Sequence, residues 1–202
     1  MNVAVAIAIA PRVREHIYCL PDDCMFATRE LLFIGKRSAI DMELHKLVKA
    51  GTLRRITRGV FKKNIPGLRM PEIQEVAEFK AGVFKKKIGR HGVSAALQIQ
   101  LLKEYDSREN EFLFYTSGSS SRLKYGKYTI RYVRACPRKL SLPDTDPGDL
   151  LKAIWFIGER NRRWLRMKVH YLLRRFQVDE YVDFRQRLKL MPSWIYTVFY
   201  PS

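Results

Sequence analysis

The chain has 202 residues, of which 47% are hydrophobic and 12% aromatic, which supplies enough apolar surface for a folded core and excludes a wholly disordered chain. It carries 38 Lys and Arg against 20 Asp and Glu, a formal net charge of +18. Since such an excess opposes compaction, we expect a polyanionic partner: nucleic acid first, then an anionic membrane surface, then an acidic protein. Three cysteines are too few for a disulfide framework and indicate a reducing compartment, so we expect a cytoplasmic protein.

An apolar run occupies residues 3–10. It has no basic region before it and is shorter than the roughly 20 residues that span a bilayer, which disfavours a signal peptide or a membrane helix. We expect instead the buried face of a first helix, continued through Arg12, Val13, Ile17 and Tyr18.

Residues 28–51 predict two further helices. Thr28 is a suitable N-cap for a short helix that Gly35 can close. Ser38 is a suitable N-cap for a longer helix that ends at Gly51. The longer helix has an apolar stripe at helical spacing, made by Ile40, Leu44, Leu47 and Val48.

A β-hairpin is expected next, with strands at 53–56 and 60–63 and a turn at Thr57-Arg58-Gly59. Three helices followed by a basic two-stranded ribbon are the order of a winged helix-turn-helix, whose third helix enters the major groove of DNA. We therefore expect an α+β protein with a winged helix-turn-helix DNA-binding domain at residues 1–67 and a mixed α/β domain at 68–202 that ends in helices. The first of these domains holds 12 Lys and Arg and 6 Asp and Glu, so most of the net charge lies in the second.

Cations and polar groups at the start of the third helix and along the ribbon suit DNA, because phosphate contacts supply affinity and base contacts from the helix supply sequence choice. The candidate DNA-binding residues are Lys36, Arg37, Ser38, Met42, His45, Arg54, Arg55, Arg58, Lys62 and Lys63. The alternative is a winged helix used only for protein contacts, with a solvated basic wing.

Three segments, Phe-Ala-Thr-Arg-Glu-Leu-Leu at 26–32, Gly-Lys-Arg-Ser-Ala-Ile-Asp at 35–41 and the Gly-Thr-Leu-Arg-Arg-Ile-x-Arg-Gly-Val-Phe wing at 51–61, resemble the N-terminal domain of AbiEi-type antitoxins. These belong to abortive-infection, type IV toxin–antitoxin pairs of bacteria. Segments 91–97, 112–118 and 129–132 are more loosely similar to the second domain of that family.

The resemblance implies an antitoxin whose winged helix binds double-stranded operator DNA to repress its own operon. It also implies that the second domain counteracts a co-encoded nucleotidyltransferase-like toxin. The DNA-facing positions that it carries over are Lys36, Arg37, Ser38, Arg54, Arg55 and Arg58. The region from about residue 150 departs from the family pattern.

In the second domain we expect a helix that starts near Pro71 and has Lys85, Lys86 and Lys87 in its last turn, where cations complement the helix dipole. Strands are expected within 112–134, with residues 112–115 as a buried run and a tight turn at 125–128. Helices are expected beyond Pro147, including one with Arg162, Arg163, Arg166, Arg174 and Arg175 largely outward.

Catalytic patterns are poor, and we expect neither an enzyme nor a cofactor. His16, Cys19 and Cys24 do not have the spacing of a common zinc finger, and the small residues at 118–121 lack a P-loop context and predict a surface loop. Two alternatives stay open. One is an RNA- or membrane-surface-interacting accessory protein that uses the winged helix for docking. The other is an enzyme acting on nucleic acid, which lacks a carboxylate cluster for metal ions.

Overall fold

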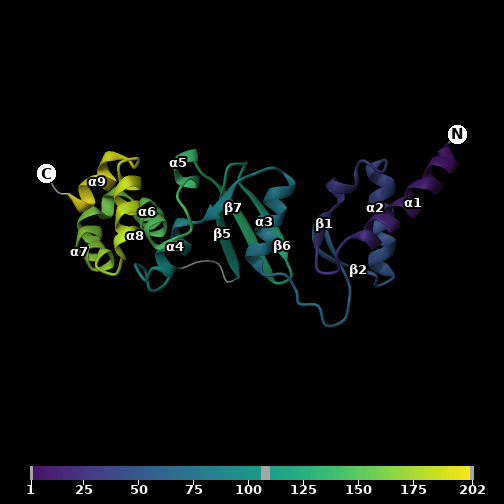
Figure 1. Ribbon diagram of the computed structural model, residues 1–202, viewed down its shortest axis with the longest axis horizontal. Coiled ribbons are helices and arrows are strands. Elements are labelled where there is room, and N and C mark those ends of the chain that lie inside the picture. The colour runs from purple at the N-terminus through teal and green to yellow at the C-terminus, as the bar shows by residue number, and fades with distance from the viewer. Residues whose placement is uncertain (1, 106–109, 201–202) are drawn as a thin grey trace. The chain divides into compact units, whose positions relative to one another are not determined.

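A computed structural model describes residues 2–105 and 110–200, with side chains from residue 9 onward. In this part of the chain the fold is α+β, with nine α-helices and two small β-sheets (Figure 1). Two compact units are formed, one from residues up to Lys85 together with Leu123–Tyr128, the other from Lys86–Arg122 and the residues from Thr129 on. The division expected between residues 67 and 68 falls inside the first unit, which also takes in the following helix.

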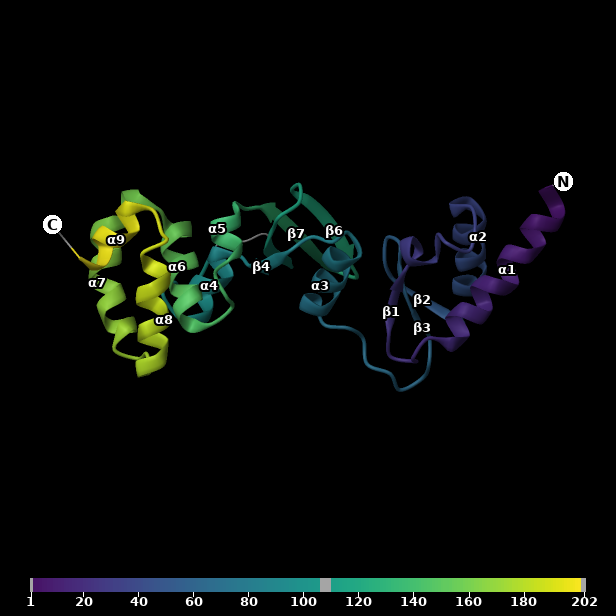
Figure 2. The ribbon, with the colours of Figure 1, turned by 45° about the horizontal axis from the view of Figure 1, so that its top comes forward.

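The first unit begins with a long helix and a three-stranded antiparallel sheet of order β1-β3-β2 (Figure 2). Its elements are α1 (Asn2–Cys19), β1 (Met25–Ala27), a 3-10 helix (Thr28–Leu31), α2 (Arg37–Lys49), β2 (Leu53–Thr57), β3 (Val60–Lys63) and α3 (Ile73–Val83). The hairpin of β2 and β3 is confirmed, and Gly59 makes its turn with a φ of 70°. The strand β1, which pairs with β3, was not expected from the sequence.

The core of this unit lies between α1, α2 and the sheet. Val13 and Ile17 of α1 are buried in one cluster with Ile40 and Leu44 of α2, as the periodicity of both helices predicts. The prediction was wrong for Arg12, which is exposed, and for Tyr18, which is 83% exposed, because each directly adjoins a buried residue in sequence and so projects from another side of the helix.

Helix α2 ends as expected but begins differently. Gly51 has a φ of 75°, and its N–H donates to the Val48 carbonyl while the Thr52 N–H donates to the Leu47 carbonyl, the two hydrogen bonds of a Schellman motif. The helix starts at Arg37, so Lys36 occupies the N-cap position and Ser38 already lies inside the first turn. The Ser38 cap was therefore wrong.

The expected Thr28 cap was wrong as well. The N-cap of the 3-10 helix is Ala27, whose backbone N–H donates to Oε2 of Glu30 at 2.7 Å. Thr28 is the first residue of that helix, and its buried hydroxyl has no hydrogen-bond partner within the described residues. Close packing against α1 requires a glycine at position 35, since a Cβ there would lie only 2.6 Å from Cδ1 of Ile9.

The chain from residue 86 on combines a four-stranded sheet of order β4-β5-β7-β6 with a group of helices, and Leu123–Tyr128 of this stretch belong to the first unit. The elements of this stretch are β4 (Ile88–Arg90), α4 (Gly92–Gln98), β5 (Glu111–Thr116), β6 (Ser121–Tyr125), β7 (Tyr128–Arg134), α5 (Pro137–Leu140), α6 (Asp146–Ile157), a 3-10 helix (Glu159–Asn161), α7 (Arg162–Leu173), α8 (Val178–Leu188) and α9 (Ser193–Phe199). β5 pairs antiparallel with β4 and parallel with β7. Two expectations were wrong: residues 85–87 follow α3 instead of forming its last turn, and Phe112 is 40% exposed.

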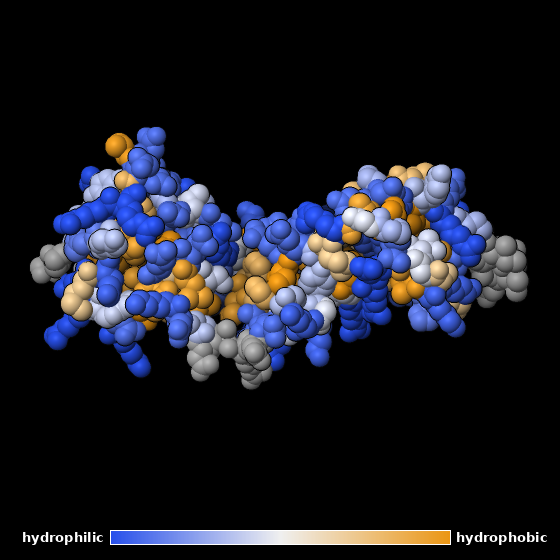
Figure 3. Space-filling view, turned by 90° about the horizontal axis from the view of Figure 1, so that it is seen from below, coloured by the Kyte–Doolittle hydropathy of each residue, from blue (hydrophilic) through white to orange (hydrophobic). Residues whose placement is uncertain are grey.

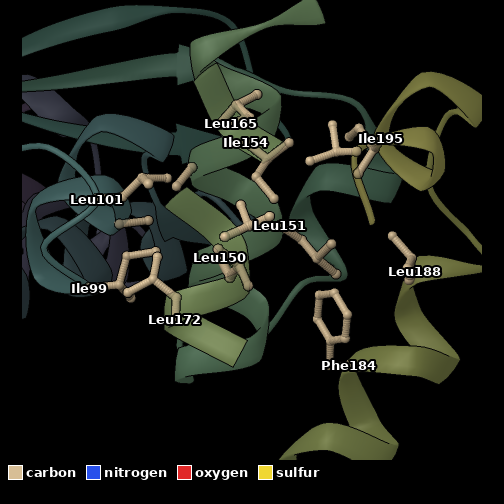
Figure 4. Close-up of a cluster of buried hydrophobic side chains, with 14 of the residues drawn as sticks. Ile99, Leu101, Leu150, Leu151, Ile154, Leu165, Leu172, Phe184, Leu188 and Ile195 are labelled. Carbon is tan, nitrogen blue, oxygen red and sulfur yellow. The ribbon is translucent and has the colours of Figure 1, made fainter. Parts of the chain in front are cut away.

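Helix α6 is the centre of the hydrophobic core of the second unit. Its side chains Leu150, Leu151 and Ile154 are fully buried, and Figure 4 shows them between Ile99 and Leu101 on one side and side chains of α8 and α9 on the other. The central position of α6 explains why its residues from Pro147 to Ile154 are all buried.

A buried ionic network accompanies this core. Lys152 of α6 is 1% exposed and donates from Nζ to the Pro143 carbonyl at 2.8 Å and to the carboxylates of Asp144 and Asp149. Arg90 of β4 pairs with the other oxygen of Asp149, which is fully buried. Two cations thus balance two carboxylates, as buried charges require.

Candidate nucleic-acid interface

The first unit contains a hollow of about 680 Å³ between the first 3-10 helix, α2, the β2–β3 ribbon and α3. Its lining is rich in cations and contains one carboxylate. The ionisable residues that line it are Arg29, Arg37, Asp41, His45, Arg55, Arg58 and Lys80. A concave surface lined by one sign of charge concentrates the electric field and favours anionic ligands.

Helix α2 contributes one polar face to the hollow. Arg37, Asp41 and His45 follow one another at intervals of four residues, so they lie along the same side of the helix. All three are exposed, while Ile40 and Leu44 on the adjacent, core-facing side of the helix are fully buried. The guanidinium of Arg37 lies 3.4 Å from the Asp41 carboxylate, an exposed ion pair of small energetic value that leaves most of the Arg37 donors available.

The ribbon contributes Arg55 from β2 and Arg58 from the turn. Successive residues of a strand point to opposite faces, so Arg54 and Arg55 cannot both face the hollow. Arg55 lines the hollow, whereas Arg54 donates from Nη1 to the sulfur of Met70 at 2.9 Å.

Helix α3 contributes Lys80, which holds the turn of the ribbon. Its ammonium donates to the backbone carbonyl of Arg58 at 2.7 Å. Burial lowers the pKa of Lys80, and the nearby charges of Arg58 and Arg37 lower this pKa further. Burial is the largest cause, and the smaller part that comes from Arg58 and Arg37 is charge repulsion, which an anion bound in the hollow would relieve.

An aromatic ring supports the cations at one side. The guanidinium carbon of Arg29 lies 5.1 Å from the centre of the Phe84 ring, and Nζ of Lys80 lies 5.4 Å from it. Both distances are typical of cation–π contacts, which orient a cation without neutralising it.

The structure separates the ten candidate DNA-binding residues into groups. Four of them line the hollow: Arg37, His45, Arg55 and Arg58. Lys36, Ser38 and Met42 are exposed on or beside α2 but do not line it, and Arg54 lies on the other face of the ribbon.

Lys62 and Lys63 are engaged elsewhere. Lys62 is 4% exposed, pairs with Asp23 and donates to the Arg69 carbonyl at 3.0 Å. Lys63 donates to Asp22 at 2.9 Å and to the Leu20 carbonyl at 2.6 Å. Both ammonium groups therefore tie β3 to the segment after α1.

Sequence reasoning missed Arg29 and Lys80. Arg29 lies in the resembling segment 26–32, which was a usable signal. Lys80 lies on a helix assigned to the second domain, and its position in the hollow depends on contacts between residues more than twenty positions apart.

No group of three His, Cys, Asp or Glu side chains that could hold a metal ion occurs within the described residues. Cys19, Cys24 and Cys136 are free and exposed. No helix in the described part of the chain is long and apolar enough to cross a membrane. The face shown in Figure 3 is mostly hydrophilic, with smaller apolar patches.

Fold and hollow together define an α+β protein with a cationic concave surface in its first unit. The chain belongs to a family of unknown function, DUF6088, whose model matches residues 5–181. No curated protein and no solved structure matches the chain significantly.

Proposed function

We propose that the first unit is a winged helix-turn-helix that binds double-stranded DNA, with α2 in the major groove and the β2–β3 ribbon against the neighbouring backbone. The observation that carries the proposal is the hollow itself, where the first 3-10 helix, α2, the ribbon and α3 together direct five Lys and Arg residues to one concave surface with one carboxylate. Phosphates are the anions that such an arrangement suits best.

The order of elements supports the same proposal. A helix, a short strand, a short 3-10 helix, a second α-helix and a two-stranded ribbon follow one another, and the short strand pairs with the ribbon. In this assignment α2 is the recognition helix. Its exposed side chains Arg37, Met42 and His45 reach bases, while Arg55, Arg58 and Lys80 bind phosphates.

In the cell, we infer, the protein represses its own operon and acts as the antitoxin of a type IV, AbiE-like pair, counteracting a nucleotidyltransferase-like toxin through its second unit. This part of the proposal rests on the resemblance of segments 26–32, 35–41 and 51–61 to AbiEi-type antitoxins. The second unit has its own hydrophobic core, which suits a separate role.

A gel-shift titration on the DNA upstream of its own operon tests the DNA-binding half. Arg55→Gln together with Arg58→Gln should weaken binding to all duplexes and lower the slope of log K against log salt by about 2, roughly one for each lost phosphate contact. A matched control is Arg12→Gln with Lys49→Gln, which removes two exposed cations outside the hollow and should leave the slope unchanged. Absence of specific binding at moderate salt would overturn the proposal.

Co-expression tests the antitoxin half. Where the adjacent gene encodes a nucleotidyltransferase-like protein, its expression alone should arrest growth and co-expression of this chain should restore it. The Arg55→Gln, Arg58→Gln variant should still restore growth, because it alters the DNA surface and leaves the second unit intact. Failure to restore growth with the unaltered chain would refute the antitoxin role without affecting the DNA-binding proposal.

A further inference from the structure

A second cationic surface lies on α7 and is unrelated to the hollow. Residues 160–176 contain seven Lys and Arg and neither Asp nor Glu. α7 therefore has no acidic residue in its first turn. Three arginines, Arg160, Arg162 and Arg163, instead lie at or just before the start of this helix. Cations near a helix N-terminus oppose the helix dipole, and neighbouring like charges repel each other. Helix stability therefore does not account for this arrangement.

Two of the seven cations have structural roles. Arg162 donates to the hydroxyl of Thr197 at 3.3 Å, and Arg166 donates to the Thr197 carbonyl from both Nε and Nη2, at 3.1 and 2.9 Å. These two arginines attach α7 to α9, so their presence is explained by packing within the second unit.

Arg160 lies in the 3-10 helix before α7, and the remaining four have no such structural role. Arg163, Lys168, Arg174 and Arg175 are exposed, and none of them forms an ion pair with a carboxylate in the described part of the chain. Arg163 lies on the side of α7 opposite to the buried Leu165, Val169 and Leu172, Lys168 lies on the flank of the helix, and Arg174 and Arg175 lie directly after its last residue, Leu173. We define the α7 face as the exposed residues Arg163, Met167, Lys168, Tyr171, Arg174 and Arg175.

Apolar side chains are interleaved with these cations. Met167 is 72% exposed and Tyr171 is 70% exposed. Arg163, Met167, Tyr171 and Arg174 follow one another at intervals of four, four and three residues, so they form one stripe along the helix. Proteins that bind single-stranded nucleic acids combine aromatic rings with cations in this way. The bases stack on the ring, and the cations on either side bind the phosphates.

We infer that the α7 face binds single-stranded nucleic acid. The cations hold the phosphate backbone, and Tyr171 stacks on a base. A helix of 12 residues is about 18 Å long, which limits the site to a few nucleotides. This site is independent of the duplex-binding hollow and does not rest on the function proposed for it.

Fluorescence anisotropy of the full chain with labelled oligouridylate and oligothymidylate tests the inference, the two probes separating RNA from DNA as the preferred strand. Arg163→Gln with Arg174→Gln should weaken binding of the preferred strand and lower its salt slope by about 1.4, roughly 0.7 for each lost contact. The matched control, Arg185→Gln with Lys189→Gln, removes two exposed cations from and just after α8 and should not change either quantity.

Tyr171 gives a readout that charge alone cannot give. Tyr171→Ala should weaken binding at least about fivefold at constant salt slope, and Tyr171→Phe should restore it. The inference would be overturned if both probes failed to bind at low salt, or if their binding were insensitive to the α7 variants. It would also be overturned by the finding that these variants abolish binding to anionic phospholipid vesicles but not to the oligonucleotides.

Discussion

Nζ of Lys80 in α3 donates a hydrogen bond of 2.7 Å to the backbone carbonyl of Arg58 in the turn between β2 and β3. The next residue, Gly59, has the positive φ that the turn requires. On the other side of the turn, the hydroxyl of Thr57 donates to the Lys124 carbonyl at 2.7 Å. The turn that presents Arg58 is thus held from two sides, and a held cation loses less conformational entropy when it binds a phosphate.

Lys80→Met should therefore weaken duplex DNA binding twice over, by removing one phosphate contact and by releasing the turn. We expect the salt slope to fall by about 1. The affinity for duplex DNA should fall by more than it does when a single exposed surface cation is removed. The comparison is Lys49→Met on α2, which removes an exposed lysine outside the hollow. Equal effects of the two substitutions would contradict the role given to Lys80.

The same lysine predicts a pH dependence of DNA binding. Burial and the charges of Arg58 and Arg37 lower the pKa of Lys80, so in the free protein it loses its proton below the ordinary lysine value. Bound phosphate favours the protonated form, so affinity should decline as the pH rises toward the ordinary lysine pKa of about 10.4. Lys80→Arg stays charged in this range and should flatten the profile. A profile that is the same in both proteins would exclude titration of Lys80.

Neighbouring arginines on β2 provide the sharpest test of which face of the ribbon meets DNA. Arg55 lines the hollow, and Arg54 lies on the opposite face beside Met70. Arg55→Gln should reduce duplex affinity and lower the salt slope by about 1, whereas Arg54→Gln should have a much smaller effect. Parallel salt titrations of the two variants measure the difference. The reverse order would place DNA on the other face and would remove the hollow from the proposal.

His91 should make the stability of the second unit depend on pH. Burial, with smaller effects from the charges of Lys139 and Arg131, lowers the pKa of His91 to about 4. Its Nδ1 accepts a hydrogen bond from the Val93 N–H at 3.2 Å, which requires that nitrogen to be unprotonated. In the unfolded chain the pKa is about 6.5, so the unfolded state binds the proton first as the pH falls.

The free energy of unfolding should thus be highest above pH 6.5 and decrease as the pH falls toward 4, by up to about 3 kcal/mol from this residue. Urea denaturation between pH 8 and 4 measures this decrease. His91→Asn keeps an N-cap acceptor but cannot titrate, so it should be less stable at pH 8 and show a weaker decrease. Identical pH profiles for the two proteins would rule out His91 as the cause.

Two glycines should respond to alanine in opposite directions. A Cβ on Gly92 would overlap Cβ of Phe156 and lie 2.6 Å from the Lys152 carbonyl, so Gly92→Ala should destabilise the protein by about 1–3 kcal/mol. Gly82 lies in α3 with no atom near its would-be Cβ and no positive φ. Gly82→Ala should be neutral or should stabilise by up to about 1 kcal/mol. Thermal denaturation of both variants and of the unaltered protein measures these changes in stability. A destabilised Gly82→Ala or a neutral Gly92→Ala would contradict this packing.

Local features of the fold could be predicted from the sequence, because they depend on residues close together in the chain. The stripe from Ile40 to Val48, the end of α2 at Gly51 and the hairpin turn at Gly59 follow from helical spacing and from residues that tolerate positive φ. The sequence also directed attention to Arg37 and Arg58, both of which line the hollow.

Long-range pairing was beyond such reasoning. The strand β1 has three residues and exists through its pairing with β3, which lies more than thirty residues later. Helices were expected beyond Pro147, but neither the bounds of α8 nor the burial of its Phe184 and Leu188 in the core around α6 was predicted. Short elements have weak local preferences, so tertiary contacts select them.

The partners of the cations show most clearly which properties the sequence determines and which depend on the fold. Composition and charge alone established a basic, folded protein that suits a polyanionic partner. In the sequence Lys62, Lys63 and Arg55 are equivalent members of a basic ribbon. The fold commits the two lysines to Asp23 and Asp22, about forty residues away, and leaves Arg55 beside Lys80 in the hollow. A cation's partner depends on the distance between charges in space, which is set only when the chain has folded.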